Sequence, residues 1–433
     1  MKKKPVGGHK KIIIYFIFVI FSFKQLFASQ ILDYETEVFL VSLISEIKLV
    51  NEIDKEIKFK IISDKSINAF VDEKNTIHIT SGLIEYSKDY VALLSVLAHE
   101  IGHIEKNHIS GRKLKISNIK KYKKFSDLSI IAGSIISKNP ILIQSLSVNQ
   151  ASVSNSFINF SKEQEFEADF YSLETLKKLG LYSSSIVELL KTIEKKSIEK
   201  GFDKKKQRIS THPYFIDRIE FTKYQNENNK QKFNIETNEQ FLFIKSKFLG
   251  YSENIEVVNT LENEYKQYSH SIINAKNGEL EKSLKKINNL ITIFPSNVYL
   301  IETKADILFS YGYTEEALQF YEKNLESEPN NKYAQIRIFT NTSIDNLTTI
   351  ETENFFLDNL NLLNNYYNNK NILLKYLEIS EKNKKDDWKN FVSFLLSNNL
   401  LELEDFLNKL NNFKKTNDIN LLNLIEIIYN ENL

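Results

Sequence analysis

Ala98-His99-Glu100-Ile101-Gly102-His103 is the most informative part of this chain, both for its fold and for its chemistry. On a helix, residues four positions apart share a face, so the imidazoles of His99 and His103 can bind one metal ion. Glu100 then lies beside that metal, where a general base is needed. With only seven histidines in the chain, this spacing rarely arises by chance. The alternative is a buried helix that happens to carry two structural histidines.

The surrounding segment favours the metal interpretation. Asp89 is suited to cap a helix over residues 90–108, and this helix is apolar on nearly every side before the motif. Such a helix is expected to be central and buried. A buried helix that carries His-Glu-His needs partners for these side chains, because unpaired polar groups are costly to bury.

A catalytic zinc site needs three protein ligands and an open position for water. The chain has no cysteine, so the third ligand has to be His, Asp or Glu. A metzincin would place a histidine six residues after the second motif histidine, but that position is Ile109. On a continuous helix His108 lies about 140° from the ligand face and is interpreted as structural.

The strong candidate for the third ligand is Glu165, on a helix expected from about Ser161 to Leu179 and ended by Gly180. Glu165 and Asp169 are again four residues apart and share a face. Glu165 can complete the zinc sphere, while Asp169 can accept the second N–H of a liganding histidine and orient it. Glu167 faces elsewhere and is interpreted as a solvated charge. The alternative is an acidic pair on a solvated helix.

The fold class expected for the chain is mainly α with a small β-hairpin. Residues 29–60 have a helical pattern, whereas the runs 68–72 and 76–80 flank a turn and predict the hairpin. Asn75 in that turn tolerates the left-handed conformation. Residues 110–160 are interpreted as a solvated basic face with a covering lid; a membrane-surface patch or a gate over the site is the alternative.

After residue 257 the pattern changes to a repeat of 34 residues. Gly278 and Gly312 have this separation, as do four further pairs of small, apolar, aromatic or proline residues. This is the pattern of tetratricopeptide repeats, which are helix pairs that stack on their neighbours. The clearest units span 264–331, and residues 332–433 are expected to form degenerate repeats or a capping bundle.

The N-terminus, residues 1–28, reads as a secretory signal peptide. A basic segment leads into the apolar run 12–23, and Ala28 is the small residue at the expected cleavage point. This run is shorter than the roughly 20 residues that span a bilayer. An uncleaved inner-membrane anchor is the alternative. The mature chain is therefore expected to be exported and soluble, and a formal charge of +1 gives no reason to expect nucleic acid as a partner.

Together, these motifs resemble the gluzincin family of the CAAX prenyl protease and the HtpX-type membrane proteases. HExxH followed by Glu-x-x-x-Asp carries the resemblance, which covers roughly residues 35–250. Further matches are Asn68-Ala69-Phe70, Gly82-Leu83 and Ser210-Thr211-His212-Pro213. The export signal and the repeats are similar to the BepA-like periplasmic branch, although the family usually has Gly where this chain has Asn75.

The resemblance implies a zincin-like α+β domain at 29–250 and a tetratricopeptide-like helical domain at 251–433. It implies one zinc ion, bound by His99, His103 and Glu165, with Glu100 activating the bound water. His212 and Arg218 match residues near the metal, where either could stabilise an oxyanion. Alternatively, His212 could occupy the open zinc position and hold the enzyme latent.

The function expected from these features is that of an exported zinc endopeptidase acting on unfolded or misassembled envelope proteins in the periplasm. Residues 76–80, taken as an edge strand, are expected to hold the substrate by strand addition. The repeats are expected to recruit an envelope protein partner such as the barrel assembly machinery. The alternative is a repeat-based chaperone or adaptor of outer-membrane protein assembly with a latent or silent protease site.

Overall fold

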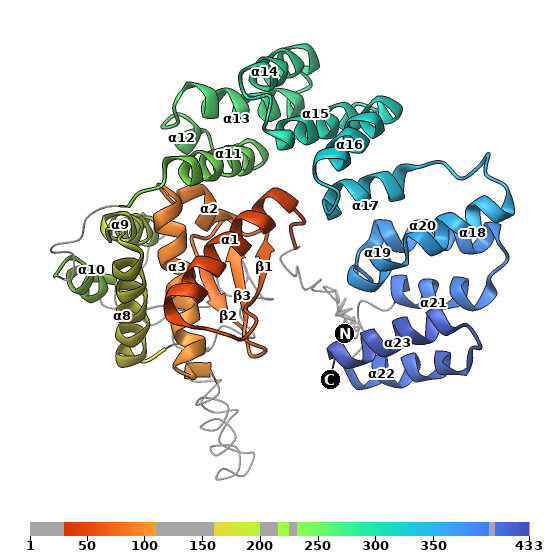
Figure 1. The fold of residues 1–433 in the computed structure, drawn as a ribbon, viewed down its shortest axis with the longest axis horizontal. Coiled ribbons are helices and arrows are strands. Elements are labelled where there is room, and N and C mark those ends of the chain that lie inside the picture. The colour runs from red at the N-terminus through yellow and green to blue at the C-terminus, as the bar shows by residue number, and fades with distance from the viewer. Residues whose placement is uncertain (1–29, 110–159, 200–214, 225–231, 398–402, 433) are drawn as a thin grey trace, which may run out of the picture. The chain divides into compact units, whose positions relative to one another are not determined.

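The computed structural model describes residues 30–109, 160–199, 215–224, 232–397 and 403–432 (Figure 1). The expected signal peptide, the segment 110–159 and the motif around His212 lie outside the described residues. Within the described part the chain is mainly helical with one three-stranded sheet, so the predicted fold class is confirmed.

The sheet-containing part of the molecule extends to the end of helix α11. Its elements are α1 (Tyr34–Asn51), β1 (Lys58–Ile62), β2 (Ala69–Val71), β3 (Thr76–Thr80), α2 (Ser81–Tyr86), α3 (Tyr90–Glu105), α8 (Lys162–Leu179), α9 (Ser184–Glu199), α10 (Phe215–Tyr224) and α11 (Ile235–Ser252). Their buried apolar side chains form one core cluster, drawn from α1, the sheet and the helices around α3.

The predicted hairpin is confirmed, since β2 pairs with β3 antiparallel. Its turn is closed by Asp72, whose Oδ1 accepts hydrogen bonds from the backbone N–H groups of Lys74 and Thr76 at 2.8 and 2.9 Å. Asn75 has a φ of 59°, the left-handed conformation that asparagine was expected to tolerate.

Two expectations about this region were wrong. The helix predicted to about residue 60 ends at Asn51, and residues 58–62 form β1, which pairs parallel with β3. The strand order is β1-β3-β2, so residues 76–80 form the central strand and cannot add a substrate strand. The edge strands are β1 and β2. Parallel pairing joins segments far apart in sequence, so local periodicity does not reveal it.

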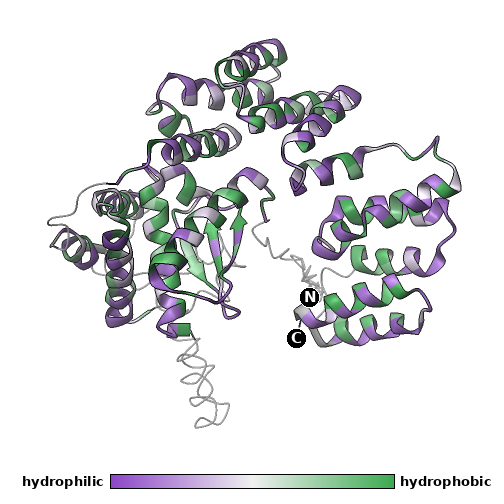
Figure 2. Ribbon diagram, in the orientation of Figure 1, coloured by the Kyte–Doolittle hydropathy of each residue, from purple (hydrophilic) through white to green (hydrophobic). Residues whose placement is uncertain are grey.

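Helix α3 lies at the centre of the core, as predicted. Asp89 caps it by accepting a hydrogen bond from the backbone N–H of Ala92 at 3.0 Å. It packs against α1, α8, α9 and β2, and its ribbon is largely hydrophobic (Figure 2). At Gly102 an added Cβ would lie 3.0 Å from the Cβ of Tyr171 and 3.3 Å from the Cα of Ala168. The absence of a side chain there lets α8 approach the face of α3 that carries the motif.

Helix pairs follow in the region of the predicted repeats. Their elements are α12 (Ile255–Val258), α13 (Asn263–Lys276), α14 (Leu280–Ile293), α15 (Val298–Ser310) and α16 (Thr314–Ser327). Gly278 and Gly312 each separate the two helices of a pair, with φ of 82° and 84°. Glycine adopts this left-handed conformation without strain, which explains its recurrence at this phase of the period.

The remaining residues are also helical, as predicted. Their elements are α17 (Lys332–Asn341), α18 (Thr349–Asp358), α19 (Leu360–Asn365), α20 (Lys370–Lys382), α21 (Asp386–Ser397), α22 (Leu403–Asn412), a 3-10 turn (Phe413–Lys415) and α23 (Ile419–Asn432). They share a separate hydrophobic cluster. None of the helices that the structure describes is long and apolar enough to cross a membrane.

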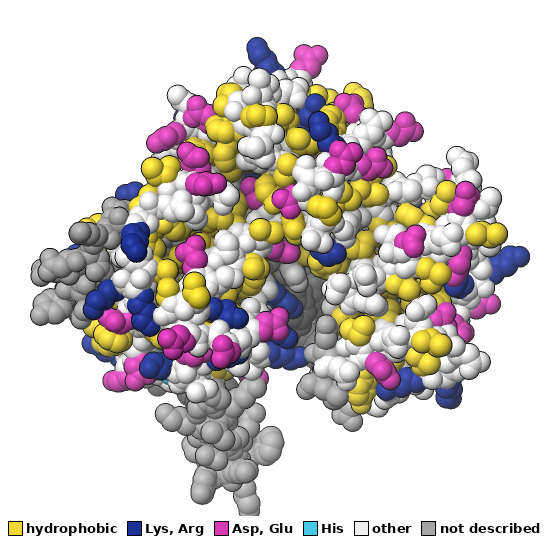
Figure 3. Space-filling view, viewed as in Figure 1, with side chains coloured by type: hydrophobic (Ala, Val, Ile, Leu, Met, Phe, Trp, Pro, Cys, Tyr) yellow, Lys and Arg dark blue, Asp and Glu magenta, His cyan; other side chains and the backbone are white. Residues whose placement is uncertain are grey.

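Helix α11 contributes to two cores around the expected domain boundary at residue 250. Phe241 and Ile244 belong to the core of the sheet-containing part, whereas Phe243 packs in the cluster of the first helix pair. On the same helix Lys247 is buried and forms ion pairs with Asp33 and Glu35 at 2.6 and 2.7 Å. On the visible face of the molecule, acidic and basic side chains are interspersed (Figure 3).

Candidate metal centre

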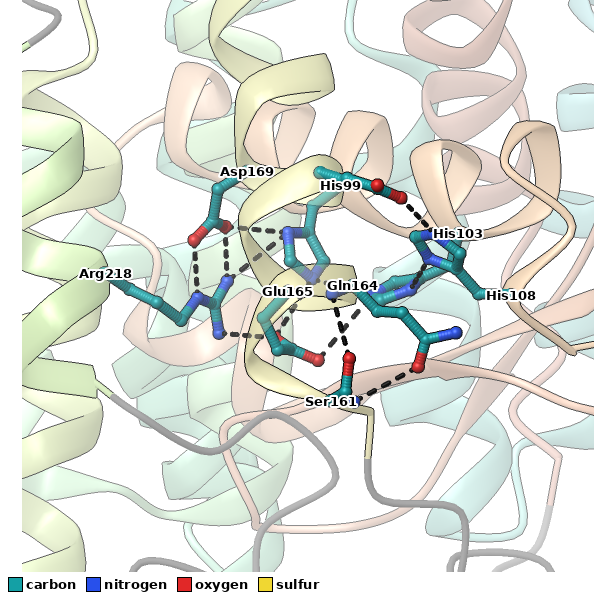
Figure 4. A network of polar contacts seen from close by, with 9 residues as sticks. His99, His103, His108, Ser161, Gln164, Glu165, Asp169 and Arg218 are labelled. Atoms are coloured by element: carbon teal, nitrogen blue, oxygen red, sulfur yellow. Dashed lines mark hydrogen bonds and ion pairs between the residues drawn. The ribbon is translucent and has the colours of Figure 1, made fainter. Parts of the chain in front are cut away.

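Two imidazoles of α3 and one carboxylate of α8 meet in the core (Figure 4). The Nε2 atoms of His99 and His103 lie 3.0 Å apart. Each lies 3.7 Å from an oxygen of Glu165, Oε2 for His99 and Oε1 for His103. All three side chains are almost completely buried. One atom from each residue falls within 4.8 Å of the others, which is close enough for the three to hold one metal ion.

The ring of His99 is oriented by Asp169, one turn after Glu165 on α8. Asp169 Oδ1 lies 2.8 Å from His99 Nδ1. Burial by itself raises the pKa of Asp169, but the Arg218 guanidinium and the hydrogen bond to His99 outweigh it and hold the pKa well below its usual range. An ionised carboxylate only accepts hydrogen bonds, so His99 carries its proton on Nδ1. Its Nε2 lone pair then faces the centre.

Arg218, on α10, lies behind these carboxylates and is 5% exposed. Its Nε and Nη2 atoms donate to the two oxygens of Asp169 at 2.7 Å each, and Nη1 lies 3.3 Å from Glu165 Oε2. The Nη2 atom is also 3.3 Å from His99 Nδ1, but both atoms are donors, so this is a contact between neighbours. Arg218 therefore braces Asp169 and Glu165 in this arrangement.

The ring of His103 has a different neighbour. His108 Nδ1 lies 2.9 Å from His103 Nδ1, and His108 Nε2 lies 2.8 Å from Glu167 Oε2. Phe160 stacks on the His103 ring with 3.6 Å between centroids. The sequence interpretation missed this role for His108 and Glu167. The available signal was the rarity of histidine, which makes a third one five residues after the motif notable.

The position of His108 follows from the end of α3. The prediction treated residues 90–108 as one helix, but α3 ends at Glu105 and Asn107 has a φ of 54°. This left-handed turn redirects the chain, so His108 lies against the motif instead of 140° away from it. Glu167 is likewise not simply a solvated charge: its side chain is 57% exposed, yet its carboxylate contacts the buried His108.

Glu100 borders a small cavity of about 60 Å³, which His99 also lines. The ionisable side chains in its lining are those of Glu100, His99, Asp169 and Arg218. The rest is largely apolar and includes Ala69 at the start of edge strand β2. This arrangement places a carboxylate, a candidate metal centre and the sheet edge around one space.

The donor set suits zinc. It consists of two imidazole nitrogens and a carboxylate, in a chain without cysteine. Catalytic zinc sites are commonly built from three such ligands with a fourth position left open for water. The residues present therefore fit a zinc ion.

Comparison with known proteins places this site in a known domain. Residues 40–226 match the family model of Peptidase family M48. This part of the chain is therefore similar to the M48 peptidases. The matched range includes the three candidate ligands, Glu100, and all the side chains around them described above.

Several curated proteins are similar to the chain at low identity. The putative beta-barrel assembly-enhancing protease of Vibrio cholerae is 25% identical over 172 residues, which are 39% of this chain and 34% of that protein. The beta-barrel assembly-enhancing protease of Escherichia coli K12 is 21% identical over 285 residues, 62% and 57% of the two chains. The metalloprotease LoiP of the same organism is 25% identical over 168 residues, 38% and 60%. The match thus spans about a third to three fifths of these relatives.

Proposed function

We propose that this chain is a zinc-dependent metalloendopeptidase. The observation that carries the proposal is the convergence of His99, His103 and Glu165 inside the part of the chain that is similar to the M48 peptidases, with Glu100 at the adjoining cavity. The first two are the histidines of the HExxH stretch, and Glu165 comes from the helix packed against it.

In the proposed reaction a bound zinc ion supplies Lewis acidity, which makes water a nucleophile near neutral pH and polarises the peptide carbonyl. Glu100 accepts the proton of the attacking water on its carboxylate and then donates it to the leaving amine. Asp169 holds the His99 ring, and Arg218 holds both Asp169 and Glu165. In this scheme Arg218 acts by positioning, because its guanidinium already lies against the two carboxylates. His212 remains a candidate for oxyanion stabilisation or for a latency contact.

We further propose that the substrate segment binds along β2 and not along residues 76–80. Strand β2 is at the edge of the sheet, and Asn68 and Ala69 line the same cavity as Glu100. Main-chain pairing with an edge strand requires an extended segment and little particular sequence. This requirement suits unfolded or misassembled polypeptides.

The names of the relatives support a role in the cell envelope. Two of the relatives are named for enhancing β-barrel assembly. We propose that the chain is exported to the periplasm by residues 1–28 and hydrolyses unfolded or misassembled envelope proteins there. The helix pairs of 264–331 would recruit a protein partner, such as the barrel assembly machinery. These helix pairs also favour a second candidate, a chaperone or adaptor whose protease site is silent.

The test compares cleavage of unfolded casein by the zinc-loaded full chain, by Glu100→Gln and by Glu174→Gln, which changes a half-exposed carboxylate on α8. Removing the general base is expected to slow cleavage by roughly 10² to 10⁴, whereas Glu174→Gln should cleave as fast as wild type. Equal rates of casein cleavage by wild type and Glu100→Gln would contradict the peptidase proposal. If neither wild type nor Glu100→Gln cleaves casein, and both still promote assembly of a barrel protein, the adaptor is supported.

A further inference from the structure

Three side chains, those of His103, His108 and Glu167, form a hydrogen-bonded series that leads away from the candidate metal centre. His103 Nδ1 lies 2.9 Å from His108 Nδ1, and His108 Nε2 lies 2.8 Å from Glu167 Oε2. His103 and His108 are buried, at 0% and 4% exposure, whereas Glu167 reaches solvent. The three residues come from α3, the turn after it, and α8.

These contacts determine where each ring carries its proton. A carboxylate accepts hydrogen bonds, so His108 donates from Nε2–H to Glu167. A neutral imidazole has one N–H and one lone pair, so His108 Nδ1 is then an acceptor. The hydrogen atom in the 2.9 Å contact must therefore belong to His103 Nδ1. The lone pair of His103 is left on Nε2, the atom that faces His99 Nε2 and Glu165.

We propose that His108 and Glu167 are positioning residues that set the tautomer of His103 and present its Nε2 atom for metal binding. This inference rests on the proposed function, because it describes the same zinc site. The stack of Phe160 holds the plane of the His103 ring, but an aromatic face does not select which nitrogen is protonated. The hydrogen-bond acceptor at His108 Nδ1 makes that selection.

The two candidate imidazole ligands are thus oriented by different means. His99 donates directly to the carboxylate of Asp169, as orienting carboxylates usually act. His103 donates to a carboxylate only through a second imidazole. Helix α8 supplies both carboxylates and the third candidate ligand, at positions 169, 167 and 165. A displacement of α8 would therefore disturb the orientation of both histidines at once.

The experiment uses two substitutions of His108, each of which keeps polar atoms near only one of the two ring nitrogens. Asparagine places an oxygen near the Nδ1 position and can still accept from His103, whereas glutamine places its polar atoms near the Nε2 position. The zinc dissociation constant of the full chain is measured by competition with a chromophoric chelator. Glu174→Ala is the control for loss of a half-exposed carboxylate on α8. Urea unfolding of the metal-free proteins checks that each variant folds.

We expect His108→Gln to weaken zinc binding roughly 10- to 100-fold, the usual effect of losing an orienting partner. His108→Asn should stay close to wild type, and Glu167→Ala should fall between the two. The visible absorption of the cobalt-substituted His108→Gln variant should also change, because the ligand field depends on how Nε2 points. Glu174→Ala should leave both measurements unchanged.

Equal zinc binding by His108→Gln and wild type would overturn the positioning role, and so would equal losses in the two His108 variants. A greater loss in His108→Asn would indicate a packing role, since asparagine leaves more empty space than glutamine. These results leave the peptidase proposal standing if wild type binds zinc and Glu100→Gln is inactive. A wild-type chain that binds no zinc would overturn the proposed function itself.

Discussion

The Nε2 atoms of His99 and His103 face each other at 3.0 Å. The other nitrogen of each ring, Nδ1, contacts a further side chain, Asp169 for His99 and His108 for His103. Two nitrogen lone pairs at this distance repel each other unless a cation lies beside them. Two imidazole ligands on one tetrahedral zinc ion, each bonded at about 2.0 Å, are about 3.3 Å apart. The two histidines are thus arranged to bind a cation. Three predictions below concern this site, and a fourth concerns a buried carboxyl among the helix pairs.

Replacing Glu165 by alanine is expected to abolish stoichiometric zinc binding. The carboxylate lies 3.7 Å from both Nε2 atoms and is the third member of the cluster. Metal content after dialysis measures the effect, with Glu174→Ala as the control. Because a ligand that binds only the folded state stabilises it, zinc should raise the melting temperature of wild type and the control but not of Glu165→Ala. Retention of one zinc per chain in Glu165→Ala would remove this residue from the ligand set.

The substitution Asp169→Asn is expected to lower the free energy of unfolding of the metal-free protein by about 3 kcal/mol, the scale measured when one partner of a buried ion pair is removed. It leaves the buried Arg218 guanidinium without its bidentate acceptor. The double variant Asp169→Asn with Arg218→Met should be less destabilised than the sum of the single variants, because no unpaired charge remains. Urea unfolding of the three variants tests this, and additive effects would contradict the coupling.

The substitution Gly102→Ala is expected to destabilise the fold and weaken zinc binding together. Alanine normally favours a helix over glycine by about 1 kcal/mol, but here its Cβ would press against Tyr171 and the backbone of α8. Overpacking costs about 1 to 3 kcal/mol and would shift the helix that carries Glu165 and Asp169. Gly278→Ala is the matched control: its left-handed φ also makes alanine costly, but it lies outside the matched domain. The prediction fails if both variants bind zinc like wild type.

Stability is expected to fall as the pH rises from about 4.5 to about 8, through Glu302 on α15. Burial raises the pKa of this carboxyl from 4.5 to about 8, even though Lys247 opposes the shift. The folded state keeps a proton that the unfolded chain releases, so it binds more protons throughout this window and loses stability as the pH increases. The protonated Glu302 contributes its full stabilisation of the folded state only below about pH 4.5.

Glu302→Gln should reduce this pH dependence, because glutamine cannot ionise and its carbonyl can still accept from Asn331. Urea unfolding at pH 6 and pH 8.5 is the measurement. Between these two pH values the free energy of unfolding should fall less in the variant than in wild type, by on the order of 1 kcal/mol. Glu316→Gln, on the exposed side of α16, should behave like wild type. Identical pH profiles for wild type and Glu302→Gln would contradict the assignment.

Local features of the fold could be predicted because they depend on residues close together in sequence. The cap at Asp89, the end of α8 at Gly180, the hairpin turn at Asn75 and the glycines between repeat helices all involve contacts within a few residues. Helical spacing also brought Glu165 and Asp169 to one face before any tertiary contact was known.

Other features depend on pairing between distant segments. The parallel pairing of β1 moved residues 76–80 from the edge of the sheet to its centre. The turn at Asn107 brought His108 into contact with His103 Nδ1, whereas an ideal helix would have placed His108 elsewhere. The direction of the Arg218 guanidinium, towards two carboxylates, was likewise not evident from its place in a motif.

Helical periodicity dictates which side chains share a face, so the residues that could carry the chemistry can be identified from the sequence alone. The sequence also predicts the turns within two helix pairs, because Gly278 and Gly312 recur where the backbone has a left-handed conformation. Tertiary packing, in contrast, brings Glu165 to the two histidines, β2 to the border of the cavity, and His108 and Glu167 to His103. The close packing of α3 on α8 at Gly102 is the physical reason, since it joins segments about sixty residues apart into one buried site.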